Sequence, residues 1–274
     1  MAEENMAGAN GRKAIFITGA ASGIGAETAR YFARKGWFCG LYDINETGLK
    51  SVAAEIGADA CHLAKLDVTK RADWAAAMEG FGAATGGKMD VLFNNAGIGR
   101  HGWFEDVPPE DSDLVIDINV KGVINGVYAA LPLLKATPGA RIINTASTAG
   151  IVGAPQLAVY SASKWAVRGL TEALDAEFRD LGIRVTTLMP WFVDTPILEM
   201  GNKEGANVKM SDQMKENGAK VYPVSMAAEK VWEAAQGDDI YYMVGGDAEK
   251  ARFMTRWLPG IVRKNIRKNV PARD

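Results

Sequence analysis

The sequence predicts an α/β protein built on one parallel sheet with helices on both faces. Short runs of β-branched and apolar residues alternate with longer amphipathic stretches along all 274 residues. Hydrophobic residues make up 48% of the chain and charged residues 23%, a balance that allows a sizeable buried core. A glycine-rich turn follows the first apolar run, where a strand would pass into a helix.

Hydrophobic periodicity places the elements in order. About seven strands are expected over Lys13–Thr18, Trp37–Asp43, Ala60–Asp67, Met89–Asn94, Arg141–Ala146, Arg184–Met189 and Ile240–Val244. Helices are expected over Gly25–Lys35, Thr47–Ile56, Arg71–Thr85, Ser112–Lys135, Ala158–Asp180 and Ser225–Ala235. This order predicts a Rossmann-like, doubly wound sheet.

No repeat, low-complexity block or linker divides the chain, so residues 1–274 are expected to form a single domain. Residues 1–12 are interpreted as a flexible leader, and residues 247–274 as a basic C-terminal extension. The irregular stretch 190–224 is interpreted as a substrate loop, because long loops in compact domains are usually functional.

Charge and cysteine content exclude several classes of function. A formal net charge of −2 argues against a nucleic-acid partner. Cys39 and Cys61 fall in expected strands, where a free cysteine acts as a small apolar residue. No apolar run approaches the roughly twenty residues of a membrane span, and the leader is polar, so a cytoplasmic protein is expected. No His, Cys or acidic set has metal-ligand spacing, so no metal is expected.

The turn after the first strand reads Thr18-Gly19-Ala20-Ala21-Ser22-Gly23-Ile24-Gly25. Gly19 permits the tight turn, Gly23 lets the backbone approach a pyrophosphate, and Gly25 allows close packing of helix on strand. Ser22 and Ile24 lie where the N–H groups of the helix N-terminus would face the phosphates. A spaced glycine triplet also occurs for purely structural reasons, so this motif alone leaves nucleotide binding open.

Asp43 ends the second expected strand, where a carboxylate can accept hydrogen bonds from the adenosine ribose. A 2′-phosphate would meet this anion, and the neighbours Ser22, Ile44 and Asn45 offer no cation to compensate. The pattern therefore predicts NAD rather than NADP. The alternative is that Asp43 is only a solvated turn residue.

Ser147, Tyr160 and Lys164 form a second constellation. Tyr160 and Lys164 are four residues apart on an expected helix and share one face. An ammonium and an oxidised nicotinamide would both favour the phenolate of Tyr160, which could then move a proton, while Ser147 could hydrogen-bond the substrate oxygen. Tyr31 and Lys35 repeat the spacing, but on the helix after the glycine turn, so that pair is interpreted as structural.

In this order, the motifs resemble those of the short-chain dehydrogenase/reductase family over Lys13 to about Ile197. The glycine turn matches TGxxxGxG, Asn94-Asn95-Ala96-Gly97 matches NNAG, Asn119 falls at the asparagine of the proton relay, and Ser147, Tyr160 and Lys164 fall at the catalytic positions.

The resemblance implies further roles for residues along the chain. Asp67 would bind the adenine amino group beside Val68, Asn94 would steady the central strand, and Asn95, Ala96 and Gly97 would line the cofactor site. Lys164 would also bind the nicotinamide ribose, and Asn119 would hold a water that links Lys164 to solvent. Pro190, Val193 and Thr195 would surround the carboxamide. Asn94 and Asn95 could instead close a turn, and Asn119 could be an ordinary helix residue.

Two positions depart from the family pattern. Trp191 stands where glycine is common, and either walls the nicotinamide pocket or packs under the loop. Thr145-Ala146 precedes the serine where a serine pair is frequent, which should matter little.

Apolar residues dominate the segments expected to contact substrate, which predicts a hydrophobic secondary alcohol or ketone. They are Ile151, Val152, Ala154, Leu157, Trp191, Phe192, Ile197, Leu198 and Met200. His101 lies in one of these loops and is expected to be exposed rather than to touch substrate.

The tail from Lys250 interleaves basic with apolar residues. It could lie on an anionic membrane, cover a neighbouring subunit, or be solvated; Pro259-Gly260 interrupts any single helix there and weakens the membrane interpretation.

The leading hypothesis is an NAD(H)-dependent oxidoreductase that interconverts a secondary alcohol and a ketone, with Tyr160 as the acid/base. Alternatives are a non-catalytic NAD sensor or scaffold and a 3-oxoacyl-thioester reductase, against which Asp43 argues because such reductases usually take NADPH. The resemblance also implies a homodimer or homotetramer.

Overall fold

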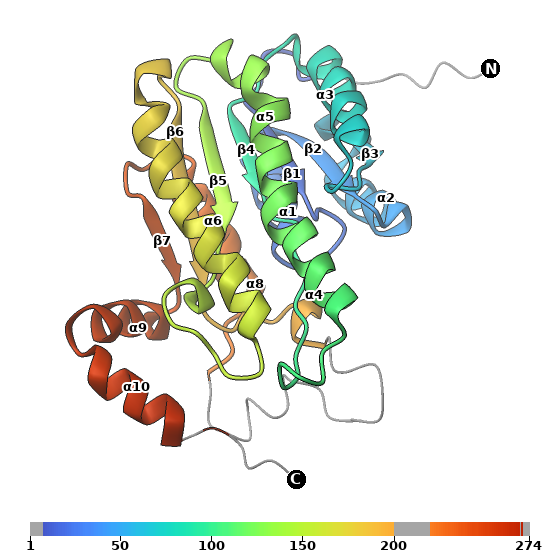
Figure 1. Ribbon diagram of the computed structural model, residues 1–274. Coiled ribbons are helices and arrows are strands. Elements are labelled where there is room, and N and C mark those ends of the chain that lie inside the picture. Colours follow the sequence, from blue (N-terminus) through green and yellow to red (C-terminus); the bar gives the residue numbers. More distant parts are fainter. Residues whose placement is uncertain (1–7, 200–219, 269, 271–274) are drawn as a thin grey trace.

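The computed structural model describes residues 8–199, 220–268 and 270, and its centre is a seven-stranded parallel sheet (Figure 1). The strands run in the order β3-β2-β1-β4-β5-β6-β7. Their bounds are β1 Ala14–Thr18, β2 Phe38–Asp43, β3 Cys61–Lys65, β4 Val91–Asn94, β5 Arg141–Thr145, β6 Arg184–Pro190 and β7 Tyr241–Val244. The order reverses between β1 and β4, where open α/β sheets bind ligands. The predicted doubly wound fold is confirmed.

Helices cover both faces of the sheet, as predicted (Figure 1). One face packs against α1 (Gly23–Arg34), α2 (Glu46–Ile56) and α8 (Val224–Ala234). The other packs against α3 (Arg71–Thr85), α5 (Gly122–Lys135) and α6 (Ala158–Glu177). Every residue of β1 is therefore buried, because both sides of the strand meet a helical layer.

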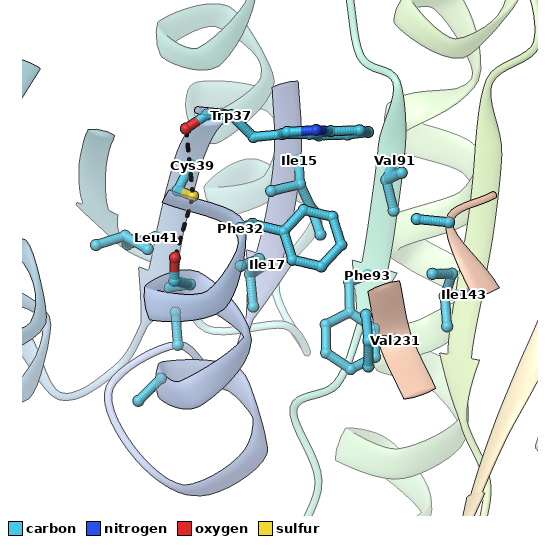
Figure 2. Close-up of a cluster of buried hydrophobic side chains, with 14 of the residues drawn as sticks. Ile15, Ile17, Phe32, Trp37, Cys39, Leu41, Val91, Phe93, Ile143 and Val231 are labelled. Carbon is cyan, nitrogen blue, oxygen red and sulfur yellow. Dashed lines mark hydrogen bonds between the residues drawn. The ribbon is translucent and has the colours of Figure 1, made fainter. Parts of the chain in front are cut away.

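The two core layers alternate along each strand. In β1, Ile15 and Ile17 point into the layer that Figure 2 shows, where Phe32 of α1 packs edge-on against Trp37. Phe16 points the other way and stacks on Tyr42 with ring centroids 3.9 Å apart. Packing on both sides of β1 fixes the position of its carboxyl end, where the glycine turn begins.

The expected helix over Ser112–Lys135 is longer and is not uniform. It begins as α4 (Pro109–Ile116), with Pro109 at a helix-compatible first position, passes through a π-helical turn at Asp117–Lys121, and continues as α5. The whole run Pro109–Lys135 is long and apolar enough to cross a membrane, but it packs on the sheet as a core helix does. π turns inside helices often mark functional sites.

The described part of the expected flexible leader is held against the core, whereas the C-terminal end is interrupted where the sequence predicts. Residues 1–7 of the expected leader lie outside the described residues, but Ala9 is buried in the core and the guanidinium of Arg12 bonds the Ala9 carbonyl. After β7 the chain forms a helical hairpin, α9 (Gly246–Trp257) and α10 (Pro259–Lys268), broken at Leu258 as Pro259-Gly260 predicted.

The long loop is described at both ends only. Val193 pairs with Tyr222 in an isolated parallel bridge, which ties the two ends together. Met200, expected to contact substrate, lies outside the described residues.

Candidate active site

A cavity of about 620 Å³ opens at the carboxyl ends of the strands. It brings together most of the residues expected at the site: Gly19, Ser22, Gly23, Ile24, Asp43, Asp67, Val68, Asn95, Ala96, Gly97, Ser147, Tyr160, Lys164, Pro190, Val193 and Thr195. Gly25 and Asn119 are not in its wall. Gly25 packs against Gly19 and Asn119 hydrogen-bonds Ile98, and both of these partners line the cavity.

The glycine turn is packed too closely for side chains. A Cβ on Gly25 would lie 2.1 Å from the Gly19 carbonyl oxygen, and a Cβ on Gly19 would lie 2.9 Å from Ala96 Cα. Gly19 also has φ +67°, which favours glycine. The turn therefore delivers the N-terminus of α1, with its free N–H groups, to the cavity wall.

Asp43 is fixed at the end of β2 by two backbone donors. Its Oδ2 accepts a hydrogen bond from the Ala21 N–H at 3.1 Å, and its Oδ1 accepts one from the Asn45 N–H at 2.9 Å. Among the described residues, the cations of the cavity wall are Lys164 and Arg100, both from chain segments far from Asp43 in sequence. Lys65, beside Asp43 in the sheet, lies 3.9 Å from Glu46. No cation of the described residues pairs with the Asp43 carboxylate, which presents its negative charge to the cavity.

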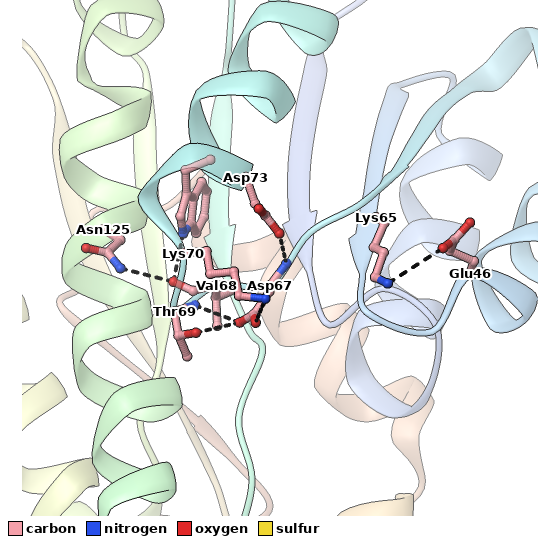
Figure 3. A network of polar contacts seen from close by, with 9 residues as sticks. Glu46, Lys65, Asp67, Val68, Thr69, Lys70, Asp73 and Asn125 are labelled. Atoms are coloured by element: carbon pink, nitrogen blue, oxygen red, sulfur yellow. Dashed lines mark hydrogen bonds and ion pairs between the residues drawn. The ribbon is translucent and has the colours of Figure 1, made fainter.

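The segment after β3 is a network of hydrogen bonds around Asp67 (Figure 3). The Asp67 carboxylate accepts hydrogen bonds from the N–H and hydroxyl of Thr69 and lies 3.2 Å from Lys70 Nζ. Burial opposes ionisation of Asp67, but these partners outweigh it and lower its pKa. The Val68 carbonyl accepts from Trp74 Nε1 and Asn125 Nδ2. These hydrogen bonds hold Asp67 and Val68 in place at the cavity wall.

Asn95 and Ala96 join the two halves of the sheet. Thr18 Oγ1 accepts hydrogen bonds from the N–H groups of both residues, at 2.9 and 3.0 Å, and Asn95 Nδ2 donates to the Thr18 carbonyl at 3.0 Å. Asn94, one residue earlier, donates to Asn144 across β4 and β5. Thr18 belongs to the glycine motif, but nothing in the motif's spacing predicts that its hydroxyl holds the segment after β4.

Asn119 is fully buried in the π-helical turn. Its Oδ1 accepts from the Ile98 N–H, and its Nδ2 donates to the Ile98 carbonyl and to Ser163 Oγ, all at 2.9 to 3.1 Å. Ser163 Oγ in turn donates to the Tyr160 carbonyl. Asn119 therefore links the segment after β4 to the helix that carries Tyr160, a connection through Ser163 that sequence reasoning missed.

Ser147, Tyr160 and Lys164 converge at one end of the cavity. Ser147 follows β5 and its Oγ accepts from the Ala149 N–H, while it also hydrogen-bonds the Tyr160 side chain. Lys164 Nζ donates to the Thr145 carbonyl at 2.8 Å and lies 5.6 Å from the centre of the Tyr160 ring. The same-face spacing on α6 thus places the phenol and the ammonium side by side.

Burial controls the titration of this pair. It raises the pKa of Tyr160, against the lowering effect of the Ser147 hydrogen bond. It lowers the pKa of Lys164 to about 8. The expectation that the ammonium favours the phenolate leaves out this desolvation, which is the larger effect on the pKa of Tyr160.

Tyr31 and Lys35 lie outside the cavity wall. The Tyr31 ring packs 6.0 Å from Trp232, and the Lys35 ammonium lies over both rings. Their role in the described fold is packing.

The segment from Pro190 to Thr195 closes the far side of the cavity. The Pro190 carbonyl accepts from Thr148, and Thr195 Oγ1 donates to the Val193 carbonyl. Wall and packing roles were the two alternatives for Trp191, and its side chain lines the cavity while it also packs against the buried cluster of Ile151 and Met243.

His101 is half-buried and lines the cavity, so the expectation of an exposed side chain is wrong. Its side chain hydrogen-bonds that of Gln156, and the Gly102 N–H donates to the Gln156 carbonyl at 3.0 Å. Burial lowers the pKa of His101, and the Gln156 bond opposes this. A contact with a residue more than fifty positions away could not be read from the local glycine pattern.

Among the described residues, no three His, Cys, Asp or Glu side chains converge as metal ligands would.

A family model described as short chain dehydrogenase matches residues 13–206, about 70% of the chain. The chain belongs to the short-chain dehydrogenase family. It is therefore an oxidoreductase of a family whose members bind a small-molecule substrate and a cofactor.

Short-chain dehydrogenases similar to this one include proteins of known structure. A 2,5-dichloro-2,5-cyclohexadiene-1,4-diol dehydrogenase of Sphingobium indicum is 40% identical over 192 residues, covering 68% of this chain and 74% of the relative. A Burkholderia phymatum member solved with NAD has a TM-score of 0.80 at 27% identity, covering 96% and 98% of the two chains. A 3-ketoacyl-(acyl-carrier-protein) reductase of Brucella melitensis, solved with NADH, has a TM-score of 0.76 at 32% identity, covering 86% and 98%.

Proposed function

We propose that this chain is an NAD(H)-dependent oxidoreductase that interconverts a hydrophobic secondary alcohol and the corresponding ketone. One observation carries the proposal: a single cavity holds Asp43 and the glycine turn at one end, and Ser147, Tyr160 and Lys164 at the other. The carboxylate and the proton-transfer group are thus held in one continuous site.

The residues present fit NAD. The glycine turn would accept a pyrophosphate, because Gly19 and Ser22–Ile24 line the cavity and no side chain caps the N–H groups at the start of α1. Asp43 would accept hydrogen bonds from the adenosine ribose, and Asp67 and Val68 would flank the adenine. Similar chains solved with NAD and NADH support this cofactor. Bound NAD would supply the hydride acceptor for alcohol oxidation, and NADH the donor for ketone reduction.

The proton would move through this chain's own residues. Tyr160 would take the proton from the alcohol oxygen or return it to the ketone oxygen, while the Ser147 hydroxyl donates a hydrogen bond to the same oxygen. The buried Lys164 would stabilise the phenolate by its charge and bind the nicotinamide ribose. Asn119 would position this machinery through Ile98 and Ser163.

Apolar side chains surround the reacting end of the cavity, and they favour a hydrophobic substrate. Those named in the wall are Leu114, Ile118, Val152, Leu157, Trp191, Phe192, Ile197 and Leu198. The related Sphingobium dehydrogenase is named for a chlorinated cyclic diol, which also favours a substrate whose hydroxyl group is carried on an apolar ring.

Turnover of a panel of hydrophobic secondary alcohols, with NAD and NADP side by side, tests the proposal. We expect turnover with NAD that falls by at least about a thousandfold in Tyr160→Phe. Tyr31→Phe is the matched control, since it removes a hydroxyl from the other Tyr/Lys pair and should leave turnover unchanged. Tight NAD binding without turnover of any alcohol or ketone would support a sensor instead.

A 3-oxoacyl thioester is the second candidate substrate, because the similar Brucella ketoacyl reductase was solved with NADH. That structure removes the argument that an NAD site disfavours this class. Reduction of a 3-oxoacyl thioester faster than any alcohol or ketone in the panel would favour it.

We also propose a cytoplasmic homo-oligomer. Cys39 and Cys61 are register partners on adjacent strands yet carry free thiols, which fits a reducing compartment. Tyr128 on α5 and Trp165 on α6 are exposed by 71% and 47%, and large exposed aromatic side chains favour a subunit contact there.

A further inference from the structure

The charges of this chain are divided between its body and its tail. Residues 250–274 contain eight of the 31 basic residues and one of the 33 acidic residues, so residues 1–249 carry a formal charge of −9 and the tail +7. In the described part of the tail, 250–268, every charged residue is basic: Lys250, Arg252, Arg256, Arg263, Lys264, Arg267 and Lys268. A segregation of this size makes the tail a distinct electrostatic surface.

The tail is an anchored helical hairpin at the carboxyl edge of the sheet. α9 follows β7, and its Ala248 is fully buried beside Ile151 and Met243. α9 also contacts the short turn Thr148–Gly150, which directly follows Ser147. α10 packs on α9 and lies beyond it, away from the sheet (Figure 1). The hairpin thus packs next to a turn whose residues Thr148 and Ala149 line the cavity.

Apolar side chains gather on this hairpin in contact with solvent. Phe253 and Trp257, one helical turn apart on α9, are exposed by 60% and 64%. Leu258 and Ile261 are exposed by 40% and 48%. Four of the ten large hydrophobic residues that are exposed in the described chain therefore fall within nine consecutive positions.

The cations of α10 are exposed and have no acidic partner among the described residues. Arg263, Lys264, Arg267 and Lys268 share one side of the helix by their spacing, and Val262 and Ile266, half-buried, share the other. In α9, by contrast, Lys250 lies 3.8 Å from Asp247, and the Arg252 guanidinium lies over the Tyr241 ring. The four cations on α10 are therefore available to bind an anionic surface outside the protein.

We propose that α9 and α10 dock this protein on an anionic lipid bilayer, with Phe253 and Trp257 inserted at the headgroup boundary and the cations of α10 bound to the headgroups. A bilayer accepts aromatic rings and cations side by side, and the two lysines among the four cations on α10, Lys264 and Lys268, are of a type depleted from protein–protein interfaces. The charge of −9 on the body would repel the same bilayer, so the protein can approach only by its tail. Docking would place the cavity's edge of the sheet at the membrane, where an apolar substrate is concentrated.

Sedimentation of the full-length protein with lipid vesicles tests the proposal. We expect it to pellet with vesicles of equal parts phosphatidylcholine and phosphatidylglycerol, to stay in solution with phosphatidylcholine alone, and to be released by salt. The triple variant Arg263→Gln/Lys264→Gln/Arg267→Gln should bind about a hundredfold more weakly, since each basic residue near an anionic surface contributes roughly a factor of five. Phe253→Ser/Trp257→Ser should also lose binding.

The matched control is Lys50→Gln/Lys88→Gln/Lys135→Gln, which removes the same charge from exposed lysines outside the tail. It should bind as the unchanged protein does, and thermal melting should show that all variants are folded. Equal pelleting with both lipid mixtures, no pelleting with either, or equal loss in the control would overturn the proposal. So would tail variants that change the subunit number in light scattering without changing vesicle binding, because the face would then be a subunit contact.

Discussion

Replacing Asp43 by serine should shift cofactor preference away from NAD. The carboxylate already accepts one N–H group on each oxygen, from Ala21 and Asn45, and it lines the cavity. Two charge-assisted hydrogen bonds to the ribose hydroxyls would contribute about 1.5 kcal/mol each, so losing both costs about 3 kcal/mol, or roughly a hundredfold in kcat/KM with NAD. NADP should gain, because its 2′-phosphate would no longer meet an anion.

The assay is steady-state turnover of one alcohol with each cofactor, reported as the ratio of kcat/KM for NAD to that for NADP. Asp43→Asn separates the two roles of the side chain, because it keeps an acceptor for the Ala21 N–H but loses the charge; it should give an intermediate ratio. Asp59→Ser, at an exposed acid outside the cavity, is the control. An unchanged ratio in Asp43→Ser would refute the assignment of Asp43 to ribose recognition.

Three further changes probe the site and the assembly. The folded-state pKa of Lys164, about 8, lies below its unfolded value of about 10.4, so between these pH values the unfolded chain binds the extra proton. The free energy of unfolding should therefore rise with pH relative to Lys164→Met, by about 2 kcal/mol from pH 8 to 10 in urea titrations, and a flat difference would contradict the buried ammonium. Gly25→Ala should cost about 3 kcal/mol of stability or prevent folding, because its Cβ would meet the Gly19 carbonyl; a melting temperature equal to that of the unchanged protein would show that the turn can relax. Tyr128→Glu should lower the mass measured by light scattering if α5 lies at a subunit interface, and an unchanged oligomer would place the interface elsewhere.

The strands could be predicted because both faces of the sheet are covered. Continuous apolar runs such as Ala14–Thr18 are visible in a single sequence. The π-helical turn at Asp117–Lys121 could not be predicted, since one residue inserted into a helix barely alters the hydrophobic period.

The residues of the site could be predicted where they belong to a local motif, but the hydrogen bonds between distant residues that hold them in place could not. Gly19 and Asp43 stand at the ends of recognisable strands, and Tyr160 and Lys164 share a helix face. Asn119 and Ser163 are 44 residues apart, and His101 and Gln156 lie in separate loops. Such pairs depend on the tertiary fold, which no local spacing encodes.

The clamp between Thr18 and Asn95 has a consequence for synthesis of the chain. β1 lies in the middle of the finished sheet, between β2 and β4. Asn95, which follows β4 and bonds Thr18 at the end of β1, comes 77 positions after Thr18 in the sequence. At translation rates of about 5–20 residues per second, one edge of β1 stays open for several seconds after β1 itself has been made. Until β4 closes that edge, the nascent chain carries an unpaired apolar strand, the form of a growing protein that chaperones bind and that other nascent chains can join.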